Sequence, residues 1–271
     1  MAFVKKPSLI FCIDTETGGL NPSINALLTV GCAWTPVTEL GNPTPNVQSV
    51  EFKMQQKPYN LVDTTDFKAP KANGDLLRDA AVPNVVTAGA LAVNKINMND
   101  HLAADTAEML DAKLCNLIRT LGAQYNIQLL GQNLKFDLRF LHRNLPHAWE
   151  MLQRLNVHHE LRTLITAYNV ASSMNVGDGY AKSTKLDELR AAKGWVSEGQ
   201  THSAAVDAVD TIKFYGLLLK EMSGKLIAPA QPQVSQGAVS QGANDPWYCT
   251  GQPVPDRIAT EEPWLKASMG G

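Results

Sequence analysis

Acidic residues beside apolar segments are the most informative feature of the sequence. Asp14 and Glu16 follow the apolar run 9–13, Asp137 follows a Gly-Gln-Asn turn, and Asp207 lies in a long apolar segment. An unpaired carboxylate is costly in apolar surroundings. Carboxylate oxygens are, however, the ligands that hard divalent cations such as Mg²⁺ prefer. The sequence therefore predicts that these carboxylates gather around metal ions.

The spacing of Asp14 and Glu16 places both carboxylates on one side of a strand. Side chains alternate along a strand, so residues two apart leave the same face. Two solvated acids at an exposed strand end would be the alternative. The Thr17-Gly18-Gly19-Leu20 segment that follows favours a ligand site, because glycine lets the backbone approach a ligand closely.

The other acidic residues stand at expected helix starts. Asp137 by itself has a structural explanation, since an acid in the first turn complements the helix dipole. His202 precedes Asp207 by five residues, with Ser203 between them as a candidate helix cap. Both side chains can then face one cleft, and together with the two upstream acidic motifs this favours a functional role for His202 over that of an ordinary core or surface histidine. Asp210 lies near the same helix face, and we interpret it as structural.

Hydrophobic periodicity predicts strands first, and then strands and helices in alternation. The expected strands are 8–14, 27–34, 48–54 and 127–130, and the expected helices are 102–122, 135–143, 161–170, 185–193 and 204–222. Residues 58–83 are expected to form loops with a short helix. Ser183 or Thr184 would cap the helix 185–193, with Asp187 in a capping box. This order predicts an α/β layer fold with a mixed central sheet flanked by helices.

The composition changes near residue 227. Residues 227–271 are rich in Pro, Gln, Ser and Gly, a composition that cannot bury a core, so we expect a domain 1–226 and a disordered tail 227–271. The tail segments Asp245-Pro246-Trp247 and Glu262-Pro263-Trp264 resemble docking peptides. They suggest a replication or repair protein as partner, and an unconstrained tail is the alternative.

Charge and cysteine usage restrict the class of protein. The net charge of -2 argues against a general nucleic-acid coat, which would be strongly basic, but allows contacts confined to one groove. The four cysteines have no paired metal-ligand or redox spacing, so free thiols in a reducing compartment are expected. No apolar run approaches the length of a membrane span. We expect a cytoplasmic protein, in the host cytoplasm if it is encoded by a phage.

Three motifs in order resemble those of the DEDDh 3'–5' exonucleases. They are Ile13-Asp14-Thr15-Glu16-Thr17-Gly18-Gly19-Leu20, Asn133-x-x-Phe136-Asp137 and His202-x-x-x-x-Asp207. Three ordered motifs are far more specific than one. This ribonuclease H-like superfamily includes the proofreading epsilon subunit of DNA polymerase III, ribonuclease T and oligoribonuclease. The likeness spans about residues 8–222. Two positions depart from the usual pattern, since Thr29 replaces a common Glu and Arg162 a common Asp.

The resemblance implies roles for individual residues. Asp14, Glu16, Asp137 and Asp207 would bind two Mg²⁺ or Mn²⁺ ions, and His202 would take the proton of the attacking water. The reaction would release nucleoside 5'-monophosphates from 3' ends. The residues expected to receive the terminal nucleotide are Thr17, Gly18, Gly19, Leu20, Asn133 and Phe136.

Three functions are compatible with this resemblance. Hydrolysis of single-stranded DNA ends is the leading hypothesis, and trimming of RNA or short oligoribonucleotides is the second, because the contacts that read a 2'-hydroxyl are local. The third is a catalytically idle nucleic-acid-binding module. Such a module would have lost a metal ligand or the histidine, whereas all five residues are present.

Overall fold

A five-stranded mixed sheet forms the centre of the computed structural model, which describes residues 6–56, 60–62, 84–174, 183–195, 197 and 202–223. The strand order is β3 (Gln48–Lys53), β2 (Leu27–Pro36), β1 (Ser8–Thr17), β6 (Asn126–Gly131) and β7 (His158–Glu160). β2 pairs antiparallel with both β3 and β1. β6 runs parallel to β1, and β7 runs parallel to β6. The predicted mixed sheet is therefore confirmed. A smaller parallel pair joins β4 (Asn60–Val62) to β5 (Val85–Thr87).

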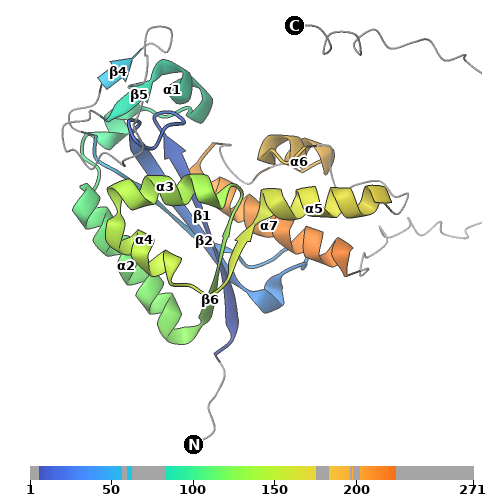
Figure 1. Ribbon diagram of the computed structural model, residues 1–271. Helices are drawn as coiled ribbons and strands as arrows, with labels where there is room; N and C mark the ends of the chain where they lie inside the picture. Colours follow the sequence, from blue (N-terminus) through green and yellow to red (C-terminus); the bar gives the residue numbers. More distant parts are fainter. Residues whose placement is uncertain are drawn as a thin grey trace, which may run out of the picture. The chain divides into compact units, whose positions relative to one another are not determined.

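Helices cover both faces of the sheet (Figure 1). The helices are α1 (Ala88–Asn94), α2 (Ala107–Gln124), α3 (Leu134–Asn144), α4 (Pro146–Gln153), α5 (Leu161–Met174), α6 (Leu186–Ala192) and α7 (Ala204–Met222), with short 3-10 helices at Val37–Glu39 and Met98–His101. Side chains of β1 point alternately to the two faces of the sheet, so they contribute to two separate hydrophobic clusters. Phe11 and Ile13 pack with α2, α3 and α4, whereas Ile10 and Cys12 pack with α5, α6 and α7.

Gly31 lets the start of α7 lie directly on β2. A Cβ atom at this position would be 2.0 Å from the carbonyl carbon of Ala204 and 2.2 Å from its oxygen. Gly31 pairs with Asp14 on β1 and with Glu51 on β3. The first turn of α7 therefore occupies the space that a side chain would fill between two acidic residues of neighbouring strands.

Local sequence patterns predicted several elements closely. The helix Ala204–Met222 has the predicted bounds, and α3 differs from its prediction by one residue at each end. The predicted helix 102–122 begins later, at Ala107, because the Thr106 hydroxyl accepts a hydrogen bond from the Met109 N–H at 3.3 Å. The strand expected at 8–14 continues to Thr17, so Asp14 and Glu16 lie within it.

The predicted capping box at α6 is wrong. Lys185 is the N-cap residue and makes no side-chain cap, although the Ser183 hydroxyl accepts a hydrogen bond from the Lys185 N–H at 3.2 Å. Asp187 instead accepts a hydrogen bond from Arg190 at 2.8 Å, because a guanidinium is a stronger donor than a backbone amide. The expected tail 227–271 and most of the expected loop region 58–83 lie outside the described residues. None of the described helices is long and apolar enough to cross a membrane.

Candidate active site

The C-terminal half of β1 carries the first two acidic residues. β6 pairs with β1 only as far as Cys12, and among the described strands β2 alone pairs with β1 beyond it. Asp14 and Glu16 continue the face that holds Ile10 and Cys12 under α7. Asp14 is partly accessible and Glu16 is buried. The apolar half of the strand thus fixes the direction of both carboxylates.

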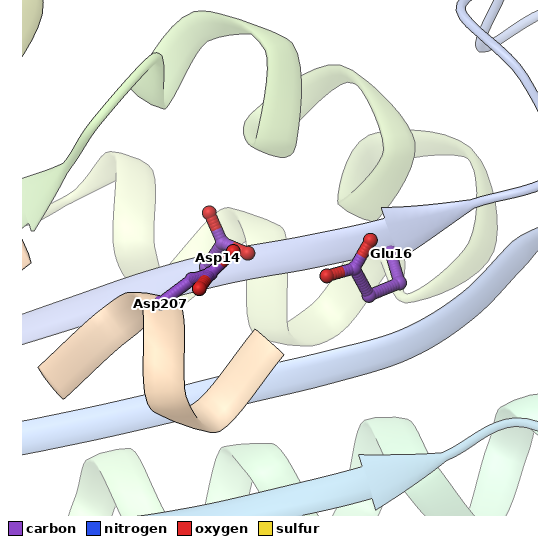
Figure 2. A group of neighbouring side chains, drawn as sticks. All are labelled: Asp14, Glu16 and Asp207. Atoms are coloured by element: carbon purple, nitrogen blue, oxygen red, sulfur yellow. The ribbon is translucent and has the colours of Figure 1, made fainter. Parts of the chain in front are cut away.

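Asp207 reaches the same place from the first turn of α7. One carboxylate oxygen each from Asp14, Glu16 and Asp207 lie within 4.8 Å of one another. Figure 2 shows the Asp14 and Asp207 carboxylates side by side, with Glu16 farther along β1. Three convergent carboxylates are a suitable donor set for a hard divalent cation. The predicted convergence of these three side chains is present in the structure.

Burial and mutual repulsion make this cluster hard to ionise. The pKa of Glu16 rises to about 8, mainly through burial, with further contributions from the charges of Asp207, Glu51 and Asp137. Burial and the neighbouring acids raise the pKa of Asp14 well above its ordinary value, and burial also raises the pKa of Asp207. A bound cation would offset the burial and the mutual repulsion that raise these pKa values. The charge distribution of the cluster therefore fits a metal site.

Asp137 lies beside this group rather than within it. It stands in the first turn of α3, where its carboxylate accepts a hydrogen bond of 2.7 Å from the Thr15 hydroxyl. Burial raises the pKa of Asp137 to about 7, against the lowering effect of the Thr15 hydrogen bond. Its charge nevertheless raises the pKa of both Asp14 and Glu16. Asp137 thus acts on the cluster through its charge, but it is not one of the three carboxylates whose oxygens lie within 4.8 Å of one another.

His202 lies at the entrance to α7 on a left-handed backbone, with φ of 64°. Its side chain is 29% exposed, and its Nε2 atom is 3.6 Å from Oδ2 of Asp187. The charge of His202 lowers the pKa of Asp207, which places the two side chains near each other. A cleft of about 290 Å³ opens here, lined by Glu16, Thr29, Glu51, Lys53, Asn94, Lys95, Ile96, Asn97, Asp100, His101, His202 and Ser203. The candidate base therefore faces the same cleft as a carboxylate of the acidic cluster.

The expected nucleotide-binding segment 17–20 is held by β5 and by its own hydrogen bonds. A Cβ atom on Gly18 would be 2.4 Å from the carbonyl oxygen of Val85, so close packing against β5 already requires this glycine. The Thr17 hydroxyl donates to the Gly19 carbonyl at 2.7 Å. Leu20, which follows, is 85% exposed. This arrangement presents an apolar side chain to solvent on a fixed backbone.

The expected second wall lies on α3. Asn133 is the exposed N-cap residue and makes no side-chain cap there, and Phe136 packs against Phe140 with 5.0 Å between ring centroids. Asn133 also lines a groove of about 500 Å³ with Lys135 and Arg162. Arg162, which stands where the related exonucleases often have Asp, thus lines the same groove as Asn133, a residue expected to bind the terminal nucleotide.

Two charged residues of the site were missed from the sequence. Glu51 accepts hydrogen bonds from the Ser203 hydroxyl at 2.6 Å and from the Ala205 N–H at 3.4 Å. Ser203 is the N-cap residue of α7, as predicted, but its hydroxyl bonds to Glu51 and makes no side-chain cap. Arg190 is buried and donates to Asp207 at 2.6 Å. The Asp187-x-x-Arg190 spacing was the only local signal for Arg190, and it indicates an ion pair within a helix.

The likeness of this chain to known proteins lies in its fold. No family model matches the sequence, and no curated protein matches it significantly. Solved structures do match: E. coli exonuclease I in complex with a dT13 oligonucleotide has a TM-score of 0.52 and 19% identity, over 80% of this chain and 42% of that chain. The chain has the exonuclease I fold. The predicted α/β fold, a mixed central sheet flanked by helices, is thereby confirmed.

Other exonuclease I structures give similar values. The complex with a 5cy-dT13 oligonucleotide has a TM-score of 0.54 and 17% identity, over 81% of this chain and 42% of that chain. The zinc-bound form of the complex with single-stranded DNA has a TM-score of 0.53 and 20% identity, with the same coverage of both chains. The chain thus spans less than half the length of exonuclease I, and the likeness concerns the fold.

Proposed function

We propose that the protein is a metal-dependent 3'–5' exonuclease that removes nucleoside 5'-monophosphates from single-stranded DNA. The observation that carries this proposal is the convergence of Asp14, Glu16 and Asp207 within 4.8 Å, beside a cleft that His202 also lines. The exonuclease I fold supports a nuclease, and exonuclease I has been crystallised with single-stranded DNA, which supports single-stranded DNA as a ligand here.

The carboxylates would hold two Mg²⁺ or Mn²⁺ ions. Asp14 and Glu16 would supply oxygens from β1 and Asp207 from α7, and Asp137 would add its carboxylate from α3, oriented by the Thr15 hydroxyl. Bound divalent cations neutralise charge on the scissile phosphate and acidify the attacking water. The protein side chains keep their positions because β1 and α7 are both anchored in the core.

His202 would accept the proton of the attacking water. A histidine ordinarily titrates near neutral pH, which suits a general base. The left-handed backbone at the start of α7 turns this side chain toward the cleft that Glu16 lines, and Asp187 lies 3.6 Å from its Nε2 atom. Attack on the terminal phosphodiester then releases the last nucleotide as its 5'-monophosphate.

The terminal nucleotide would lie against the segment 17–20. The backbone of Thr17 and Gly19 would face the sugar, and the exposed Leu20 side chain would pack against the base. Gly18 would contribute close approach rather than a hydrogen bond, because its N–H and carbonyl already bond to Ala26 and Thr87. Asn133 and Phe136 would form the second wall, where stacking on an aromatic ring contributes about 1–3 kcal/mol per base. The next phosphates would enter the groove lined by Asn133, Lys135 and Arg162, which offers two cationic side chains.

A time course on matched 5'-labelled DNA and RNA strands tests the proposal. The expected result with Mg²⁺ is a ladder that shortens from the 3' end, faster for DNA, and that disappears with EDTA. Asp14→Asn is the matched inactive control, because it keeps the side-chain shape and leaves Arg190 with its partners. Faster cleavage of RNA would support the exoribonuclease alternative, and absence of cleavage of both strands would support an idle binding module.

The tail 227–271 is proposed to tether the enzyme to a replication or repair protein. Its two acid-proline-aromatic segments are the only basis for this proposal. Deletion of residues 228–271 should leave cleavage of free oligonucleotides unchanged and abolish capture of the partner from cell extracts. Retention of every partner by the truncated protein would refute the tether.

A further inference from the structure

Arg190 of α6 connects the acidic cluster to two carboxylates outside it. Its guanidinium donates from Nη2 to Oδ1 of Asp207 at 2.6 Å, from Nε to Oδ2 of Asp210 at 2.8 Å and from Nη1 to Oδ1 of Asp187 at 2.8 Å. The side chain is only 6% exposed. Because the guanidinium is planar and its N–H groups point in fixed directions, three partners hold it in a single orientation.

Asp210 is the buried anchor of this arrangement. It lies three residues after Asp207 on α7 and is 1% exposed. Besides Arg190, it accepts a hydrogen bond of 2.7 Å from the Ser197 hydroxyl. Asp210 is not among the three carboxylates that converge near Asp14. It therefore fixes Arg190 from a position that does not itself bind the proposed cation.

Asp187 carries the connection onward to His202. One of its oxygens, Oδ1, accepts from Arg190, and the other, Oδ2, lies 3.6 Å from Nε2 of His202. Asp187 is 56% exposed, so this second half of the arrangement lies at the rim of the site. A single guanidinium thus contacts a proposed metal ligand directly and the proposed base through one intervening carboxylate.

We propose that Arg190 is a positioning residue that holds Asp207 in its metal-binding orientation and, through Asp187, holds His202 over the cleft. The part that concerns His202 rests on the proposed nuclease function. The part that concerns Asp207 is a statement about metal affinity and can be tested without cleavage.

Two variants at position 190 separate the effect of the guanidinium's fixed geometry from the effect of its positive charge. Arg190→Lys keeps the positive charge but loses the fixed fork that reaches three carboxylates, whereas Arg190→Met loses both. Residues that orient metal ligands typically contribute 10–100-fold to metal affinity or activity. We expect calorimetry to show Mn²⁺ binding at least about tenfold weaker for both variants, with circular dichroism confirming that they are folded.

Two outcomes at position 190 would overturn the inference. Unchanged Mn²⁺ affinity in folded Arg190→Lys would mean that the fixed geometry is unimportant. Tighter binding in Arg190→Met would mean that Arg190 acts as a cation that competes with the metal. Because both outcomes are read from binding, they are independent of whether the wild-type protein cleaves nucleic acid.

Asp187→Asn tests the connection to His202 and remains informative if the Arg190 variants fail to fold. We expect kcat on single-stranded DNA to fall about tenfold, with KM and Mn²⁺ affinity within twofold of wild type. Glu188→Gln is the matched control, since this neighbouring residue is 54% exposed and pairs with Lys185 at 3.3 Å. Equal kcat values for the Asp187→Asn variant and the wild type would refute the connection. An inactive wild type would instead refute the proposed function.

Discussion

Gly31→Ala should displace the helix that brings Asp207 to the site. The added methyl group would be 2.0 Å from the carbonyl carbon of Ala204 and 2.3 Å from the amide nitrogen of Ala205. Ordinary contacts of a Cβ atom begin at 3.4 Å, so the start of α7 must move away from β2 by about 1.4 Å. Both obstructing groups belong to the backbone, and a change of side-chain rotamer cannot relieve the clash.

The displacement predicts a loss of both stability and activity. Overpacking of this kind costs about 1–3 kcal/mol of unfolding free energy. Asp207 lies in the first turn of α7 and would move with it, away from Asp14 and Glu16. A misplacement of about 1 Å in a catalytic group lowers the rate by roughly 100-fold. We therefore expect kcat to fall by about that factor while the protein remains folded.

Denaturant unfolding and single-stranded DNA cleavage with Mg²⁺ measure the two effects. Gly89→Ala is the matched control, because nothing lies within 4 Å of the added methyl group in α1. The control should raise the unfolding free energy by about 0.5–1 kcal/mol, as expected for alanine in a helix, and leave kcat unchanged. Wild-type stability and kcat in Gly31→Ala would refute the contact between α7 and β2.

Three further predictions concern pH and substrate contacts. The folded, metal-free protein keeps protons on Glu16 up to about pH 8 and on Asp137 up to about pH 7, well above their ordinary values. The unfolded chain releases these protons near pH 4, so the melting temperature should fall as pH rises from about 4 to 8. Mg²⁺ should raise the melting temperature more at pH 8 than at pH 5. A melting temperature that does not change with pH would contradict these protonation states. Thr15→Val removes a hydrogen bond that lowers the pKa of Asp137, so the acidic limb of the pH–rate profile should move to higher pH, and an unmoved limb would count against this role. Leu20→Ala should raise KM several-fold at unchanged melting temperature, because the side chain is 85% exposed; an unchanged KM would remove Leu20 from the substrate site.

Local patterns in the sequence determined the main elements and part of the site. Alternation along β1 placed Asp14 and Glu16 on one face, and helical periodicity gave the bounds of α7 that carry Asp207. The order of strands and helices gave the mixed sheet. These features were predictable because each depends on residues that are neighbours in the chain, where the period of two or 3.6 residues decides the direction of a side chain.

Only the tertiary structure decided how the charged side chains pair. Asp137 turned toward Thr15, 122 positions away, and Glu51 accepted the hydroxyl of Ser203, 152 positions away, in place of an ordinary helix cap. Asp187 accepts a hydrogen bond from Arg190 rather than forming the expected capping box, and the same guanidinium also donates to Asp207. Hydrogen-bond partners depend on distances of about 3 Å, and such distances between remote segments are set by packing of the whole core rather than by local pattern.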